Sequence, residues 1–238
     1  NPRFPQNRLN RPNGLTDKKG ADMKKSVFLM ILITVLAWGA TLWLDPPAPN
    51  MRSLMHEVYY LDGLLAWEAF AGAILLMTQP RLVAGLTGAS FPEIGFWHKA
   101  LGVSAILLSL IHWGTRMIFS PLVEPFATEP VPHIARHAAE GGFSAFWGAL
   151  RPFAETSGLV LTIAACVLVI LAVIPLLKGK YLWMQVHRLL GIVFIALTIH
   201  SIRLIETSDL LMPLGILTIL VTIVGVICSV TAFLPKKY

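Results

Sequence analysis

Six long apolar stretches restrict this chain to a membrane fold. They cover roughly residues 25–44, 58–79, 94–119, 156–177, 182–205 and 210–233. About 20 apolar residues are enough for an α-helix to cross the hydrocarbon core of a bilayer. Because 55% of the 238 residues are hydrophobic and only 13% are charged, the chain also lacks the polar surface of a water-soluble protein. We predict an all-α integral membrane bundle of six helices.

The N-terminal end differs from the rest in composition. Residues 1–22 are rich in Pro, Asn and basic side chains and hold little to bury, so we expect a disordered tail or a remnant of upstream sequence. Met23 resembles a natural start, and the segment after it also resembles a signal peptide. Its apolar run, 27–44, is long enough to span, and we expect an uncleaved first helix. Residues 23–238 then form one transmembrane domain.

Lysine and arginine are distributed unevenly over the two sets of helix ends. One set carries Lys24, Lys25, Arg81, Lys99, Lys178, Lys180, Arg188, Lys236 and Lys237, and the other carries Arg52, Arg116, Arg136, Arg151 and Arg203. Cytoplasmic loops carry the excess of these residues, and an even number of spans puts both termini on one side. We expect a multi-pass protein of a bacterial inner membrane with both termini in the cytoplasm. This distribution also explains the formal charge of +6, so we expect no nucleic-acid partner.

The connection at 120–155 is the one long loop, and this topology places it outside. Within it, segment 143–155 has apolar residues at helical spacing, which predicts a short helix that lies on the membrane surface or caps the bundle. Core packing between helices is the alternative for these apolar residues. His133 and His137 stand one turn apart with Glu140 just beyond. That spacing fits a metal ion, but it is more typical of a solvated helix face.

Four of the seven histidines lie in two spanning stretches, His98 and His112 in the third and His187 and His200 in the fifth. Each pair has one member near each membrane boundary, and 14 residues at a helical rise separate the two levels by about 21 Å. Neutral imidazole is a good axial ligand for haem iron. A lone intramembrane histidine is more often a satisfied polar residue, but four that pair by level favour two haem sites.

Helical phase supports one of these spacings better than the other. A step of 14 residues returns to within about 40° of the same helix face, whereas the step of 13 from His187 to His200 falls about 140° away. The fifth helix is then either irregular, with Gly191 tolerating the departure, or it approaches the two haems differently.

The segments WHKALGVSAILLSLIHW (97–113) and VHRLLGIVFIALTIHS (186–201) resemble the third and fifth helices of the ferric reductase and NADPH oxidase transmembrane superfamily. That superfamily uses the same spacings of 14 and 13 for its haem ligands. The resemblance covers residues 58–233 and implies two b-type haems between helices 3 and 5. It implies that His98 and His187 bind the inner haem iron and that His112 and His200 bind the outer one.

Cationic residues adjoin all four histidines, and haem propionates need cationic partners near the membrane boundary. Arg116 and Arg203 follow the outer ligands by about one turn, while Lys99 and Arg188 adjoin the inner ones. We therefore predict that all four help to bind the haems, although interfacial anchoring explains the same placement.

Two acidic residues, Asp62 and Glu68, lie inside the second stretch, where carboxylates often mark proton routes or cofactor contacts. A buried, neutral, hydrogen-bonded Glu68 is an equal alternative. In NADPH oxidases a histidine is typical at the position of Arg116, and this departure weighs against direct reduction of oxygen.

The function that the resemblance implies is transmembrane electron transfer by a membrane oxidoreductase. FAD and NAD(P)H would belong to a cytoplasmic flavin reductase, on an attached domain or a separate subunit, because this chain contains no G-x-G-x-x-G or P-loop motif. The outer acceptor is a small molecule, with ferric iron or a ferric chelate expected first and O2 second. One alternative is a haem subunit for a periplasmic reductase. A different class is a haem-free transporter whose histidines relay protons or bind a transition metal.

Overall fold

A computed structural model describes residues 14–123, 143–173, 180–205 and 209–234, and all of its regular elements are helical. The long helices are α1 (Gly14–Leu44), α2 (Met51–Thr78), α4 (Phe91–Gly114), α6 (Phe143–Val173), α7 (Lys180–Leu204) and α8 (Pro213–Thr231). The short ones are α3 (Pro80–Thr87), a π-helical turn (Thr115–Phe119), α5 (Ser120–Val123) and a 3-10 turn (Asp209–Leu211). The predicted all-α class is confirmed.

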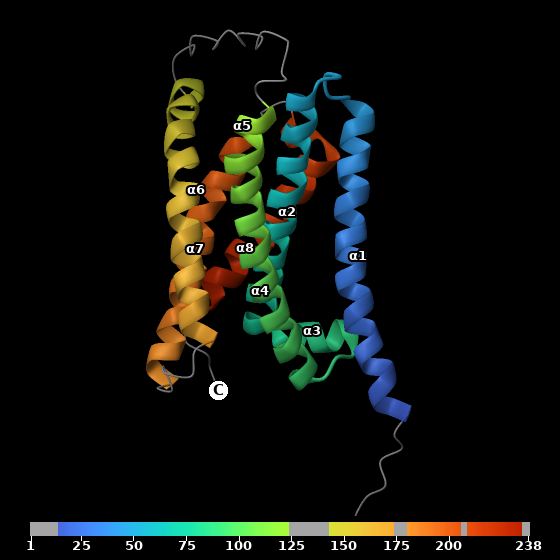
Figure 1. The fold of residues 1–238 in the computed structure, drawn as a ribbon. Helices are drawn as coiled ribbons and strands as arrows, with labels where there is room; N and C mark the ends of the chain where they lie inside the picture. Colours follow the sequence, from blue (N-terminus) through green and yellow to red (C-terminus); the bar gives the residue numbers. More distant parts are fainter. Residues whose placement is uncertain (1–13, 124–142, 174–179, 206–208, 235–238) are drawn as a thin grey trace, which may run out of the picture.

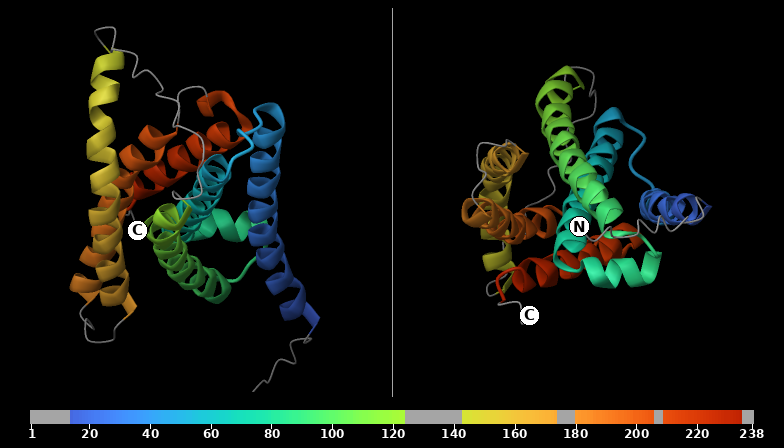
Figure 2. Two further views of the ribbon diagram at one scale, coloured as in Figure 1. Left: turned by 45° about the horizontal axis from the view of Figure 1, so that its top comes forward. Right: turned by 90° about the horizontal axis from the view of Figure 1, so that it is seen from below.

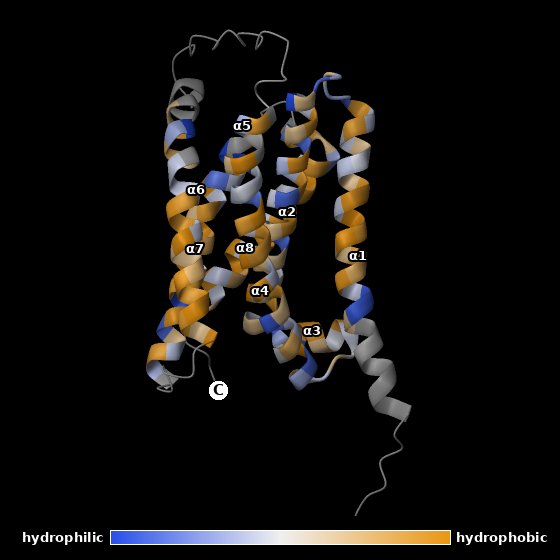
Figure 3. Ribbon diagram, in the orientation of Figure 1, coloured by the Kyte–Doolittle hydropathy of each residue, from blue (hydrophilic) through white to orange (hydrophobic). Residues whose placement is uncertain are grey.

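Six helices in the described part of the chain are long and apolar enough to cross a membrane. They are Met23–Leu44, Met51–Thr78, Phe91–Ile118, Ala149–Val173, Tyr181–Arg203 and Pro213–Thr231. Large apolar side chains are exposed on these helices. Hydrophobic positions dominate their ribbons, with hydrophilic positions along α2 as well as at helix ends (Figure 3). The predicted number of spans and their approximate positions are therefore confirmed, and the protein is a multi-pass membrane protein.

Successive long helices run in alternating directions, so α1 begins and α8 ends at the same end of the bundle (Figure 1). The pair α2 and α4 forms the centre, with α6 and α7 on one side and α1 on the other (Figure 2). Helix α8 crosses behind and packs on α1, α2 and α7. Because α4 runs opposite to α2 and parallel to α7, His98 and His187 lie towards one end and His112 and His200 towards the other.

Local sequence signals explain where several helices begin and end. Asn50 caps α2 by accepting a hydrogen bond from the backbone N–H of Ser53 at 2.8 Å. Ser90 and Glu93 form a capping box at the start of α4. Gly88, with φ of 67°, ends α3 in the left-handed conformation that glycine adopts without a steric penalty.

Two predicted boundaries differ from the structure. Helix α1 begins at Gly14, so residues 14–22, which we expected in a disordered tail, are helical; residues 1–13 lie outside the described part. The separate surface helix predicted over 143–155 is wrong, because α6 is continuous from Phe143 to Val173 with Pro152 inside it. Proline removes a single backbone donor, and the helix continues through that loss.

A stacked aromatic pair joins the centre of the bundle. The rings of Trp67 on α2 and Phe194 on α7 are nearly parallel, with centroids 3.9 Å apart, and Phe194 has no exposed surface. The indole N–H of Trp67 donates to Thr222 of α8 at 3.0 Å. Gly225 of α8 lies so close that a Cβ there would stand 2.3 Å from Phe194. Helices α2, α7 and α8 are therefore fixed to one another at this level.

Candidate functional site

The inner pair of predicted ligands is brought together by the fold. The ring centroids of His98 on α4 and His187 on α7 are 5.9 Å apart, with their planes inclined by 31°. His98 Nδ1 donates to the backbone carbonyl of Ala73 on α2 at 2.9 Å. His187 Nδ1 donates to the carbonyl of Trp183, one turn earlier on α7, also at 2.9 Å. Helices α4 and α7 therefore bring the imidazoles of His98 and His187 next to each other.

The outer pair is anchored on two different helices. His112 Nδ1 lies 2.7 Å from Oδ1 of Asp62 on α2. His200 Nδ1 donates to the carbonyl of Ala154 on α6, also at 2.7 Å. Both histidines are half-buried. Since α4 packs on α2 and α7 packs on α6, each ligand is held by the helix against which its own helix packs.

All four histidines use the same ring nitrogen in the same way. A backbone carbonyl or a carboxylate accepts hydrogen bonds, so each partner selects the tautomer with the proton on Nδ1. In that tautomer the lone pair is on Nε2, which is the form in which imidazole binds a metal ion. A hydrogen bond from the other ring nitrogen to an oxygen is also the usual support of a metal-bound histidine.

Glycines stand beside both outer histidines. A Cβ on Gly158 of α6 would meet Cε1 of His200 at 2.3 Å, and a Cβ on Gly63 of α2 would meet Cε1 of His112 at 3.1 Å. The imidazoles therefore lie directly against the backbones of α6 and α2. Sequence reasoning missed both glycines, although a glycine in the middle of an apolar helix is itself a sign of close approach.

The two histidines of α7 are 13 residues apart, and their side chains point in different directions. Helix α7 is α-helical throughout, so the irregular fifth helix that we considered is not observed. His187 instead lies beside His98 of α4, while His200 points to α6, as an offset of about 140° requires. The irregular turn follows His112, where α4 passes into the π-helical turn. Such turns are frequent at functional sites.

The donor set suits haem iron better than a bare metal ion. Among the described residues, no group of three or more His, Cys, Asp or Glu side chains gathers where it would hold a metal. A haem iron receives four ligands from its porphyrin and needs two more from the protein. His98 and His187, with ring centroids 5.9 Å apart, are two imidazoles that would fit such a need. His133, His137 and Glu140 lie outside the described residues.

The four cationic residues near the ligands differ in burial. Lys99 and Arg116 are exposed, and Arg203 is half-buried. Arg188, next to His187, has its Nε atom buried with no hydrogen-bond partner in the described part of the chain. A buried, unpartnered guanidinium nitrogen costs free energy unless an acceptor reaches it, so Arg188 has the character of a group that binds an anion.

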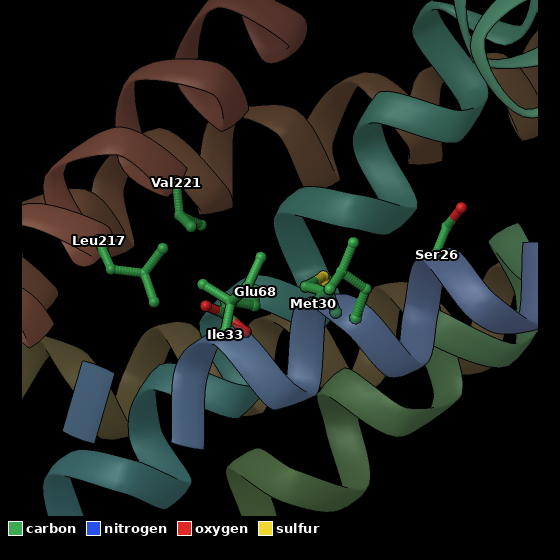
Figure 4. Close-up of a pocket in the computed structure, with 7 residues that line it drawn as sticks. Ser26, Met30, Ile33, Glu68, Leu217 and Val221 are labelled. Carbon is green, nitrogen blue, oxygen red and sulfur yellow. The ribbon is translucent and has the colours of Figure 1, made fainter. Parts of the chain in front are cut away.

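The two carboxylates of α2 have different surroundings. Asp62 contacts His112, as described above, whereas Glu68 is only 2% exposed and accepts a hydrogen bond of 2.6 Å from Thr34 of α1. Glu68 also lines an apolar cavity of about 270 Å³ between α1, α2 and α8, among Met30, Ile33 and Leu217 (Figure 4). Asp62 thus contacts a predicted ligand, whereas Glu68 is buried and hydrogen-bonded.

Comparison with family models identifies the family of the chain. A family model described as the ferric reductase like transmembrane component matches residues 62–198, which is more than half of the chain. The match begins at Asp62 and includes His98, His112 and His187, ending two residues before His200. Searches of curated proteins and of solved structures find no match. The chain belongs to the ferric reductase-like transmembrane component family, and it is at this level a membrane oxidoreductase.

Proposed function

We propose that this protein transfers electrons across the membrane through two b-type haems, each bound by two histidines. The observation that carries the proposal is the common state of the four imidazoles, all of which donate through Nδ1 to an oxygen. In this state Nε2 of each imidazole is left as the atom that would bind a metal ion. Family membership supports the same class of reaction.

The spacing of the inner pair supports ligation of one iron. Bonds between a metal ion and imidazole nitrogen are about 2 Å long, so two nitrogens on opposite sides of one iron lie about 4 Å apart and their ring centroids about 6 Å apart. His98 and His187 have a centroid separation of 5.9 Å. We assign them to the inner haem, and His112 and His200 to the outer one.

The chemistry of a doubly ligated haem is one-electron transfer, because two imidazoles leave no open position for a substrate. The residues of the chain would orient the imidazoles for this one-electron transfer. The carbonyls of Ala73, Trp183 and Ala154 hold three imidazoles in their binding orientation, and Asp62 holds the fourth. Between the two levels, α2, α7 and α8 pack through the buried rings of Trp67 and Phe194.

The cationic residues next to the ligands bind the propionates in this proposal. Arg188 carries the strongest support, because its buried Nε has no partner in the described part of the chain. Lys99 is the second inner partner, and Arg116 and Arg203 serve the outer haem. A guanidinium offers several donors in a fixed plane, which suits a carboxylate that must stay in one orientation.

The proposal also requires an electron donor and an electron acceptor. We propose that a reduced flavin on a cytoplasmic domain or subunit, itself reduced by NAD(P)H, supplies single electrons to the inner haem. The acceptor on the outer side is ferric iron or a ferric chelate, before O2. A periplasmic reductase served by this chain is the alternative acceptor within the same class.

An optical spectrum of the purified protein tests the proposal. We expect sharp b-type bands that shift on reduction with dithionite, and about two haems per chain by the pyridine haemochrome assay. A colourless preparation from haem-replete cells contradicts the proposal and favours the haem-free transporter, in which Glu68 and the histidines would relay protons.

Single replacements of the ligands test the assignment to two levels. His112→Leu or His200→Leu should leave one haem per chain, which a flavin donor on the cytoplasmic side still reduces. His98→Leu or His187→Leu should remove the other haem and so block electron delivery from that side. Equal loss of both haems in every variant would contradict separate levels, provided that His56→Leu, a histidine outside the proposed site, keeps two.

A further inference from the structure

One of the four ligand anchors differs chemically from the other three. The imidazoles of His98, His187 and His200 donate to neutral backbone carbonyls. His112 instead faces the carboxylate of Asp62, at 2.7 Å between Nδ1 and Oδ1. A carboxylate carries a full negative charge, so it polarises the N–H bond of the imidazole much more strongly than a carbonyl does. The two haem sites are therefore electrostatically unequal.

The surroundings of Asp62 concentrate this effect on His112. The side chain is only 14% exposed, and its second oxygen, Oδ2, is buried without a hydrogen-bond partner in the described part of the chain. A buried carboxylate needs compensating positive charge nearby. The contact that the structure provides is His112, and beyond it the metal that this imidazole would bind. In a site of low dielectric constant such a charge acts over a longer range than in water.

We propose that Asp62 is a positioning residue that lowers the reduction potential of the outer haem by acting through His112. This inference rests on the proposed function. Its negative charge makes the imidazole a stronger donor, as carboxylate partners of metal-bound histidines do. A stronger donor and a nearby negative charge both favour the ferric over the ferrous state, because the ferric state carries one more positive charge. The outer haem thereby becomes a stronger one-electron reductant towards the acceptor outside.

A redox titration of the holoprotein, followed optically, tests this inference. Asp62→Asn keeps the size of the side chain and an oxygen that accepts from His112, and it removes the charge. The matched control is Glu68→Gln, which removes a second buried carboxylate from the same helix that is bonded to Thr34 and not to a histidine. His112→Leu, which lacks the outer haem, identifies the component of the titration that belongs to it.

We expect Asp62→Asn to favour the reduced outer haem at least tenfold, which for one electron is an upward shift of 59 mV or more. The inner potential should not change, and Glu68→Gln should shift the outer potential by less. The low-spin electron paramagnetic resonance signal of the outer haem should also change in Asp62→Asn alone. An unchanged outer potential in an Asp62→Asn protein that holds both haems overturns the inference.

The other outcomes of these experiments also support or overturn the proposed role of Asp62. If Asp62→Asn loses the outer haem while Asp62→Glu keeps it, the outer potential of Asp62→Glu decides: a value as low as that of the wild type supports the inference, and an upward shift of 59 mV or more overturns it. If both variants lose it, any change of shape suffices and the inference is overturned. A wild-type protein without haem overturns the proposed function together with this inference. A two-haem protein whose outer potential ignores Asp62 overturns the inference alone.

Discussion

Replacing Gly158 by alanine adds one methyl group directly against the ring of His200. The new Cβ would stand 2.3 Å from Cε1 and 2.4 Å from Nδ1 of that imidazole, whereas ordinary van der Waals contact begins at 3.4 Å. The ring must therefore move away from α6 by about 1 Å. Because the acceptor of its hydrogen bond, the Ala154 carbonyl, is on the same helix, the bond of 2.7 Å lengthens to about 3.7 Å and is lost.

The magnitude follows from these two effects. A lost hydrogen bond costs about 1 kcal/mol, and overpacking in a dense interior costs about 1–3 kcal/mol more. Together they amount to about 2–4 kcal/mol. At about 1.4 kcal/mol for each factor of ten, binding of the outer haem should weaken by about 30-fold to 700-fold.

Haem content and the redox difference spectrum of Gly158→Ala measure this loss. We expect close to one haem per chain at limiting haem supply, with the inner potential unchanged. Gly63→Ala is a graded comparison, since its Cβ would stand 3.1 Å from His112 and requires a shift of only a few tenths of an ångström. Gly39→Ala, with nothing within 4 Å, should behave as wild type. Two haems at wild-type potentials in Gly158→Ala would refute the reasoning.

Three further predictions test the packing and the charge around the site. Gly225→Ala should lower the free energy of unfolding by about 1–3 kcal/mol, because its Cβ would stand 2.3 Å from the wholly buried Phe194. The control is Gly191→Ala, whose Cβ would have its nearest contact at 3.6 Å, and both variants are measured by unfolding in detergent. Thr34→Val should destabilise the fold by about 1–3 kcal/mol, because it leaves Glu68 without its hydrogen-bond donor. Thr78→Val, which loses a hydrogen bond within its own helix, should not. Equal unfolding temperatures of the two variants would contradict this prediction. Arg188→Met should lower the reduction potential of the inner haem and leave the outer potential unchanged in an optical redox titration, since it removes a cation next to the proposed inner haem. Lys99→Met, at an exposed side chain, should shift the inner potential by less. An unshifted inner potential in Arg188→Met would exclude contact of Arg188 with a propionate.

The six spans and the helices that carry the four histidines were predictable from the sequence. An apolar stretch of about 20 residues predicts a membrane helix, since a helix satisfies all the backbone hydrogen bonds of a spanning segment within that segment. The boundaries were less predictable. The apolar residues at helical spacing over 143–155 predicted a short separate helix, but the structure has one helix from Phe143 to Val173, with Pro152 inside it. A proline near a helix end removes one hydrogen bond, and surrounding contacts decide whether the helix ends there.

The anchors of the histidines were not predictable, for a physical reason. Three of the four are backbone carbonyls, and every residue has one, so the identities of Ala73, Trp183 and Ala154 carry no signal in the sequence. The fourth, Asp62, was visible as an acidic residue in an apolar stretch, but its partner was not. Fifty residues separate it from His112, and only the packing of α2 on α4 brings the two together.

These anchors show how α7 presents two histidines, the proposed ligands at two levels, in different directions. His187 faces α4 and is held within its own helix, whereas His200 faces α6 and depends on the Ala154 carbonyl and on the space above Gly158. The outer site therefore depends on α2 and α6, helices that carry no predicted ligand, more than the inner site does. Substitutions at Asp62 and Gly158 should then affect the outer haem selectively, even though both lie outside the helices whose histidine spacing is typical of the family.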